Sequence, residues 1–236
     1  MKQSVFIIIF LSIASICCAQ KTSHYKLHFS EFNELKVSDG INVDYYCDPQ
    51  RAGTVEFDAD ESVASAIIFT PGKGKLKVSL ASRDSAYRNL PTVKVYSSFL
   101  SSVRNEGDST VRVLSPAPGP ELKARLIGNG RLVVRDCKAV RTNLEIISGK
   151  GTIMATGTTT TAKMIIAGAG DIQADDLMAE DVSADIAGTG TIACYATKKL
   201  SVGGLGSGKI NYRGKPEIKT KFLSKVKVYA IDSNAD

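Results

Sequence analysis

Apolar and polar residues alternate through the C-terminal half of the chain, and a Gly-x-Gly pair interrupts this alternation every 18 to 21 residues. The pairs are Gly128/Gly130, Gly149/Gly151, Gly168/Gly170, Gly188/Gly190 and Gly206/Gly208. Self-similarity at a short, fixed period is typical of a solenoid, in which one unit stacks on the next around a shared core. The pattern therefore predicts a stack of rungs, each about 20 residues long.

Alignment of the repeats on their second glycine brings apolar residues into register. Two residues later stand Leu132, Ile153, Ile172, Ile192 and Ile210, and four residues later stand Val134, Ala155, Ala174, Cys194 and Tyr212. Four residues before that glycine stand Leu126, Ile147, Ile166, Ile186 and Gly204. An apolar residue at every second position predicts strands with one face inward. A helix is disfavoured, because glycine costs about 1 kcal/mol at an interior helical position.

The glycine pairs are expected at corners, where the chain turns between two faces and a positive φ is often required. The outward position after each pair carries a small or charged residue, namely Arg131, Thr152, Asp171, Thr191 and Lys209. We expect these five side chains to form a solvent-facing ladder, which is the first candidate binding surface.

The residues before the proline-rich segment Ser115–Pro120 also alternate, but less regularly. They predict strands at residues 35–37, 41–45, 55–57, 76–80 and 93–95, a degenerate rung at 103–113, and one or two helical turns within 60–68. The predicted class is thus all-β: a β-solenoid, like a parallel β-helix, with a more irregular β-rich N-terminal part. We expect that part at 20–115, with the rungs and a C-terminal capping strand at 116–236, and we expect the two parts to form one continuous stack.

The N-terminus has the pattern of a secretory signal peptide. Lys2 precedes an apolar run from Val5 to Ile16, and small residues end the segment at Ala19. Acylation of Cys17 or Cys18, as in a lipoprotein, is the rival interpretation. It requires a small residue just before the modified cysteine, and Ile16 and Cys17 are poor residues there. We expect cleavage after residue 19, export to the periplasm or outer surface of a Gram-negative-type cell, and no membrane span.

Composition narrows the function further. The net charge of +6 is spread along the chain with acids interleaved, which argues against a nucleic-acid partner. Only 7% of residues are aromatic and none is Trp, so platforms for base or sugar stacking are scarce. Three cysteines remain after the signal, an odd number that does not suit a disulfide scaffold. With two histidines in all, His24 and His28, no metal site or cofactor is expected.

Three further motifs have weaker interpretations. Gly203–Lys209 approaches a phosphate-binding loop, but Ile210 stands where the loop needs Ser or Thr. Asp84-Ser85-Ala86 and Asp108-Ser109-Thr110 resemble an O-glycosylation motif of exported proteins. The densest acidic stretch runs through Asp171, Asp175, Asp176, Glu180, Asp181 and Asp185. We interpret it as a solvated face, with paired carboxylates for glycoside chemistry as the alternative.

Several segments resemble one known family. Phe29-Ser30-Glu31-Phe32, the stretch from Leu35 to Val43, Pro91–Val95 and Gly206–Pro216 follow the order found in the family described as "putative auto-transporter adhesin, head GIN domain". Gly40-Ile41-Asn42 matches the name-giving triplet, and the resemblance covers about residues 29 to 214. It implies a secreted, β-rich protein with a β-helix-like stack, and it brings no catalytic residues.

Together these features favour a non-enzymatic exported module for adhesion, recognition or cell-envelope structure, with a surface glycan or a protein as partner. Asn42 and Asp44 are the second candidate binding residues, because they are polar positions between inward apolar ones. The alternative is a carbohydrate-active enzyme or polysaccharide-binding protein on a β-helix. Self-association through the end rungs of the stack is a further expectation, since such ends are open sheet edges.

Overall fold

The computed structural model describes residues 22–82, 90–221 and 224–231. These residues form 17 strands, one short α-helix and one 3-10 turn. The N-terminal elements are β1 (Ser23–His28), β2 (Glu34–Ser38), β3 (Asn42–Cys47), η1 (Pro49–Arg51), β4 (Thr54–Ala59), α1 (Glu61–Ala66), β5 (Ile67–Gly72), β6 (Lys75–Leu80), β7 (Thr92–Ser97), β8 (Ser102–Glu106) and β9 (Thr110–Ser115). The remaining strands are β10 (Gly119–Ile127), β11 (Arg131–Ser148), β12 (Thr152–Ile166), β13 (Asp171–Ile186), β14 (Thr191–Gly203), β15 (Lys209–Arg213), β16 (Glu217–Thr220) and β17 (Lys227–Ala230).

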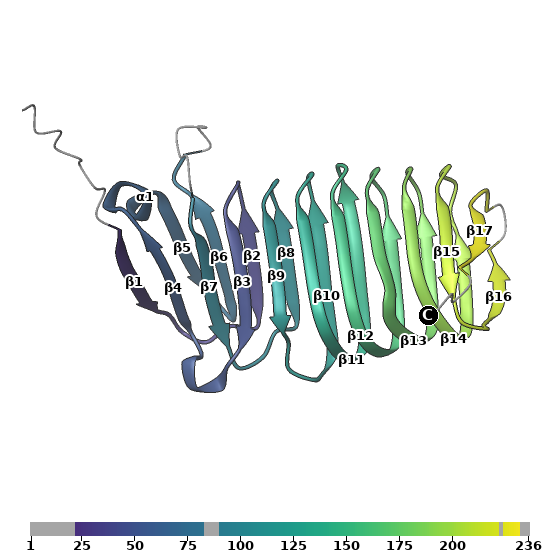
Figure 1. Cartoon of the computed structure of the whole chain (residues 1–236), viewed down its shortest axis with the longest axis horizontal. Helices are drawn as coiled ribbons and strands as arrows, with labels where there is room; N and C mark the ends of the chain where they lie inside the picture. Colours follow the sequence, from purple (N-terminus) through teal and green to yellow (C-terminus); the bar gives the residue numbers. More distant parts are fainter. Residues whose placement is uncertain (1–21, 83–89, 222–223, 232–236) are drawn as a thin grey trace, which may run out of the picture.

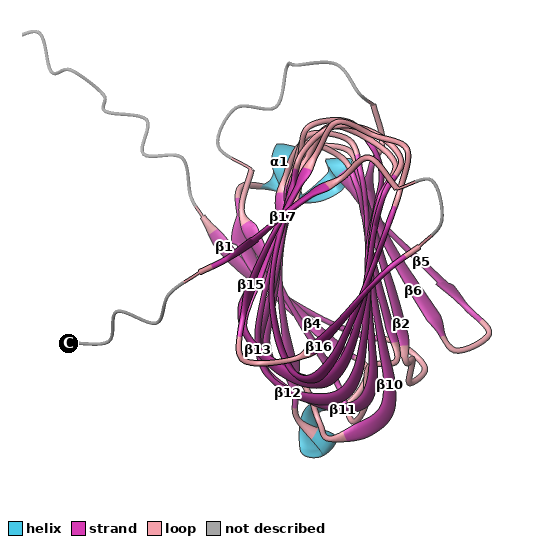
Figure 2. Cartoon of the chain, turned by 90° about the vertical axis from the view of Figure 1, so that its right-hand side faces the viewer, coloured by secondary structure: helices cyan, strands magenta, loops and turns pink. Residues whose placement is uncertain are grey.

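The strands build a flattened solenoid whose rungs follow one another along the long axis (Figure 1). Seen from its end, the coil has two facing sheets (Figure 2). What we call the first sheet runs β1, β4, β7, β3, β9, the N-terminal parts of β11 to β14, β15 and β17. The second sheet runs β5, β6, β2, β8, β10, the C-terminal parts of β11 to β14, and β16. The predicted β-solenoid with an irregular N-terminal part is confirmed.

The core lies between the two sheets and is filled by the inward side chains that the alternation predicts. All five residues two places after the second glycine are fully buried: Leu132, Ile153, Ile172, Ile192 and Ile210. One alignment was wrong. Ile147 is 40% exposed, and Ile146 is the buried residue. The register between β10 and β11 shifts by one residue after Leu126, and this shift exchanges the inward and outward positions at the end of β11.

The Gly-x-Gly pairs lie at the corner that joins the second sheet to the first, as predicted, but the main reason differs from the expected one. Positive φ occurs at Gly128, Gly149 and Gly190, and at none of the other pair glycines. Close stacking explains the rest. A Cβ placed on Gly188 would overlap the carbonyl oxygen of Gly168, one rung below. The corner backbones therefore pack directly on each other, and only a residue without a side chain fits.

The N-terminal part departs from simple stacking. The rung formed by β2 and β3 pairs with the β6–β7 rung on one side and with the β8–β9 rung on the other. The chain therefore leaves the stack after β3, adds β6 and β7 on one side of this rung, and then adds β8 and β9 on its other side. Beyond β6 and β7, the strands β1, β4 and β5 pair antiparallel. Helix α1, capped by Asp60 through its bond from the Val63 N–H, connects β4 to β5. From β8 and β9 both sheets continue into β10 and β11 without a break.

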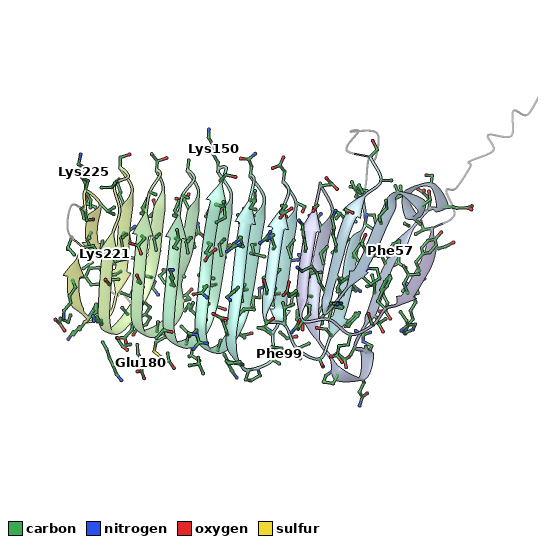
Figure 3. The ribbon with its side chains drawn as sticks, turned by 180° about the vertical axis from the view of Figure 1, so that it is seen from behind. Phe57, Phe99, Lys150, Glu180, Lys221 and Lys225 are labelled. Atoms are coloured by element: carbon green, nitrogen blue, oxygen red, sulfur yellow. The ribbon has the colours of Figure 1, made fainter. Side chains whose placement is uncertain are left out.

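At the opposite corner the long strands bend from the first sheet to the second. The threonine run at 158–161 lies in this bend, where Thr159 is buried and accepts a hydrogen bond from the Thr142 hydroxyl at 3.1 Å. Figure 3 shows Lys150 at the glycine corner and Glu180 at this opposite edge. None of the helices in the described part of the chain has the length and apolar character needed to cross a bilayer.

Candidate binding surface on the first sheet

The outward ladder predicted from the repeats exists as one continuous row across the first sheet. Arg131, Thr152, Asp171, Thr191 and Lys209 lie in register on successive strands. Thr110 precedes Arg131 in the same row, and Lys227 follows Lys209. Asn42 extends the row on β3, beside Thr92 of β7. The ladder and the GIN triplet, predicted as two separate candidates, therefore belong to one surface.

Two residues of this row bind the neighbouring rung. The side-chain oxygen of Asn42 accepts a hydrogen bond from the Thr110 N–H at 2.9 Å, and that of Asp171 accepts one from the Thr191 N–H at 2.8 Å. Each bond satisfies a backbone donor near the start of the next strand. Asn42 and Asp171 thus hold rungs together, although the two amide N–H groups of Asn42 have no partner among the described residues.

Asp44 lies two residues further along β3 and is only 7% exposed. Its carboxylate accepts hydrogen bonds from Nε and Nη2 of Arg112 on β9, at 2.5 Å and 2.8 Å. These bonds raise the pKa of Arg112 above its ordinary value. Such a two-pronged pair fixes the plane of the guanidinium. Asp44 therefore positions Arg112, and the Nη1 nitrogen has no partner among the described residues.

A groove of about 550 Å³ opens on the first sheet over β3, β7, β9, β11 and β12. Its lining comprises Asn42, Thr92, Thr110, Arg112, Arg131, Val133, Val134, Arg135, Met154 and Thr156. Three of these residues are arginines, and none is an acid. The other candidates lie beside or beyond the groove: Asp44 is hydrogen-bonded to Arg112, while Thr152, Asp171, Thr191 and Lys209 continue the row towards the C-terminal end.

The groove also contains the arginines that lack a carboxylate partner. The described residues include eight arginines, and six of them form ion pairs: Arg51, Arg104, Arg112, Arg125, Arg141 and Arg213. The two without one are Arg131 and Arg135, both exposed, both on β11 and both lining this groove. The surface therefore presents guanidinium groups that no acid of the described residues neutralises.

Sequence reasoning found Arg131 and Asn42 but missed Arg112, Arg135 and Met154. Arg112 lies opposite Val133 in the adjacent strand, a pairing that follows from the 21-residue spacing when the rung at 103–113 is aligned with its successor. Arg135 lies four residues after Arg131, so the alternation along the strand places it outward, although it is not next to a glycine pair. No local signal places β3 beside β9, since 68 residues separate Asn42 from Thr110.

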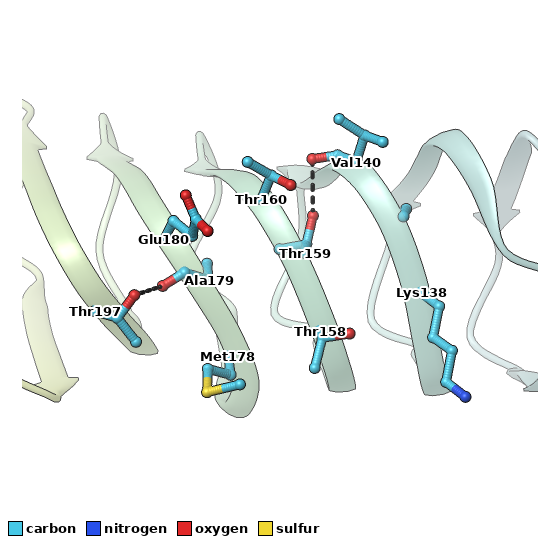
Figure 4. Close-up of a pocket in the computed structure, with 10 residues that line it drawn as sticks. Lys138, Val140, Thr158, Thr159, Thr160, Met178, Ala179, Glu180 and Thr197 are labelled. Carbon is cyan, nitrogen blue, oxygen red and sulfur yellow. Dashed lines mark hydrogen bonds between the residues drawn. The ribbon is translucent and has the colours of Figure 1, made fainter.

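A second depression, of about 440 Å³, lies at the bend opposite the glycine corner (Figure 4). Exposed Val140 and Met178 lie along it with threonines of the 158–161 run. Some of its polar groups are used locally: Thr159 donates to the Val140 carbonyl at 3.3 Å, and Thr197 donates to the Ala179 carbonyl at 3.2 Å. Its lining contains one cation, Lys138, and one acid, Glu180, whereas the arginine groove presents three cations and no acid.

The acidic stretch does not assemble into one site. Asp171 lies on the first sheet, Asp175 and Asp176 at the bend, and Asp181 and Asp185 on the second sheet. Arg213 pairs with Asp175 and Asp176, and Lys198 and Lys221 pair with Glu180 and Asp185. The convergent carboxylate pair that the enzyme alternative requires is not seen among these residues.

The phosphate-loop-like segment, the histidines and the Asp-Ser-Thr motif that the structure describes do not form ligand sites. Ile210, in the loop that resembles a phosphate-binding motif, is fully buried in the core. His24 bonds Asp58 at 2.8 Å on an exposed edge, and the described residues contain no cluster of three His, Cys, Asp or Glu able to hold a metal ion. Ser109 is buried, so the folded chain does not offer its hydroxyl for glycosylation, and Ser85 lies outside the described residues.

The fold and this surface define a two-sheet β-solenoid that carries an arginine groove on one flat side. The model of the family described as putative auto-transporter adhesin, head GIN domain, matches residues 31–216. The chain therefore belongs to this family, which confirms the resemblance seen in its segments. A comparison with curated proteins gives no match.

Solved structures of several bacterial proteins share the fold. A putative adhesin from Bacteroides fragilis NCTC 9343 superposes with a TM-score of 0.81 at 20% identity, over 90% of this chain and 98% of that one. A putative adhesin from Parabacteroides merdae ATCC 43184 gives 0.71 at 22% identity, over 91% and 98%. A putative lipid binding protein from Parabacteroides distasonis ATCC 8503 gives 0.70 at 20% identity, over 91% and 98%.

Proposed function

We propose that this chain is an exported, non-enzymatic recognition module of the adhesin type, and that it contacts its partner through the first sheet. One observation carries the choice of surface. All the outward arginines of the second sheet, Arg104, Arg125 and Arg141, pair with glutamates, whereas Arg131 and Arg135 on the first sheet pair with nothing in the described residues. Unneutralised guanidinium groups in a groove favour a ligand, because they are ready to form charge-assisted hydrogen bonds.

Membership of an adhesin family supports this role, and the scatter of the acidic residues favours recognition over glycoside hydrolysis. Export is supported by the signal-peptide pattern of residues 1–19, which lie outside the described residues. N-terminal sequencing of the mature protein tests it, with Gln20 expected as the first residue.

A glycan and protein array tests the surface assignment. The wild-type protein is compared with the double variant Arg131→Ala/Arg135→Ala and with Lys163→Ala/Lys199→Ala. The second pair removes the same charge from exposed positions on the second sheet, where neither lysine has a carboxylate partner among the described residues. We expect only the arginine variant to lose binding. Loss in both variants, or in neither, would reject the first sheet as the contact surface. Release of sugar from any bound polysaccharide would instead reveal an enzyme.

Self-association through the end rungs stays a separate prediction. β16 and β17 form the C-terminal end of the described stack and have no strand beyond them among the described residues. Light scattering over a range of protein concentrations tests it, with a rising mass expected if the ends associate.

A further inference from the structure

The arrangement of cations in the groove points to a ligand with several separated negative charges. Arg131 and Arg135 lie on one strand, four residues apart, which is at most about 13 Å of extended chain at 3.3 Å per residue. Arg112 lies on the neighbouring strand opposite Val133, midway between them in register. The three guanidinium groups are therefore distributed along the groove. A small monovalent anion would contact one of them, and a chain carrying repeated charges could contact all three.

The rest of the lining offers no aromatic ring on which a sugar could stack, but its polar and aliphatic groups can bind a sugar without stacking. Threonine hydroxyls at 92, 110 and 156 and the free amide N–H groups of Asn42 offer both donors and acceptors at the rim. Thr156 is held in place because its hydroxyl accepts the Asp136 N–H at 3.1 Å. Between these polar groups lie Val133 and Met154, the latter 37% exposed. A pyranose ring combines hydroxyl groups with an apolar face and so matches this alternation of polar rim and apolar floor.

The lining distinguishes this ligand class from nucleic acid. Single-stranded nucleic acid is held by aromatic platforms as well as by cations, and the groove lining contains no Phe, Tyr or Trp. Preorganisation adds to the case for a specific site. Asp44 fixes Arg112 in one orientation, so the ligand does not bear the whole cost of ordering that side chain.

Building on the proposed recognition function, we propose that the groove binds an acidic polysaccharide through Arg112, Arg131 and Arg135. The groups recognised are carboxylates or sulfates on successive sugars. Both fit the fork of N–H donors that a guanidinium presents. Binding through such exposed contacts weakens as salt screens the charges.

The test measures binding of the purified protein to four probes at about 50 mM NaCl, where charge screening is weak. Polygalacturonate carries carboxylates, dextran sulfate carries sulfates, dextran is neutral, and single-stranded DNA represents nucleic acid. We expect one or both acidic polysaccharides to bind and dextran not to bind. Arg131→Ala/Arg135→Ala should weaken that binding about tenfold for each arginine removed. Lys163→Ala/Lys199→Ala should leave it within about twofold, and the relative response to carboxylated and sulfated probes identifies the favoured anion.

Several results overturn the inference: equal binding of dextran, unchanged binding by the arginine variant, equal weakening by the lysine variant, or tighter binding of DNA than of either acidic polysaccharide. The two proposals fail in different ways. If the array retains binding to a neutral glycan or a protein that depends on the arginines, the acidic ligand is wrong and recognition by the first sheet stands. If the arginine and lysine variants behave alike on the array, the surface itself is wrong.

Discussion

The guanidinium of Arg112 forms two hydrogen bonds with the carboxylate of Asp44, a residue 68 positions earlier in the chain. The pair spans β3 and β9, strands brought together because the chain leaves the stack after β3 and later returns beside it. It is thus a contact between distant parts of the sequence, at the point where the irregular N-terminal part joins the regular rungs. It also orients one of the three arginines of the groove.

Asp44→Asn should lower the free energy of unfolding by about 2 kcal/mol, because it removes the charge from a nearly buried hydrogen-bond acceptor and leaves Arg112 without its anion. Urea denaturation measures the change. Glu217→Gln provides the control, since its pair with Lys219 is exposed and should contribute less than about 1 kcal/mol. Equal effects of the two substitutions would mean that the Asp44–Arg112 pair has no special structural role.

Whether a corner glycine tolerates substitution should depend on the free space next to its Cα atom. Gly188→Ala should destabilise the fold by about 1–3 kcal/mol, because the new Cβ overlaps the backbone of the rung below and forces the corners apart. Gly40→Ala should change stability by less than about 0.5 kcal/mol, since a Cβ there meets no atom within 4 Å. Thermal unfolding of the two variants tests the contrast. A loss for Gly40→Ala as large as that for Gly188→Ala would contradict close stacking as the reason for glycine at these corners.

The stacking itself could be predicted from the sequence, because each rung repeats the same short-range pattern and neighbouring rungs are consecutive. The buried positions of Ile153, Ile172 and Ile192 follow directly from it. Where a rung gains or loses a residue the prediction fails, as at Ile146 and Ile147. The alignment assumed one register throughout, whereas the strand ladder accommodates the change through a local irregularity.

The candidate site could be predicted only in part. Arg131 can be predicted because it belongs to the repeat, and Asn42 because it is a polar position between inward apolar ones. Their position in one row depends on the insertion of the β2–β3 rung between β6–β7 and β8–β9, which is a long-range choice of strand partner. No local pattern encodes such a choice, since any rung with the same alternation offers the same backbone edge.

The cysteines should differ sharply in reactivity. Burial raises the pKa of Cys194 to about 12 and also raises that of Cys137, so both thiols stay protonated and covered at pH 8. Cys47 is partly exposed and donates to the Ser98 carbonyl at 3.2 Å. Iodoacetamide at pH 8 should therefore label Cys47 in the folded protein, and all three cysteines in guanidinium chloride, as read by peptide mass spectrometry. Labelling of Cys194 at the rate of Cys47 would show that the core does not protect Cys194 from the reagent.

Protonation of Glu106, on β8 of the second sheet, should lower the free energy of unfolding at acidic pH. Burial alone would raise the pKa of this carboxyl, but hydrogen bonds from Lys36 and Arg104, at 2.7 Å and 3.1 Å, outweigh burial and hold it below the ordinary 4.5. Since the folded-state pKa is the lower one, the unfolded chain binds more protons between the two values, and stability falls as the pH drops through that window.

Urea unfolding at a series of pH values from neutral to below 4.5 should show a smaller loss of stability for Glu106→Gln than for the wild type. The variant should also be less stable than the wild type at neutral pH, because it lacks the carboxylate that Lys36 and Arg104 share. Parallel pH profiles for the two proteins would show that Glu106 contributes nothing to acid sensitivity.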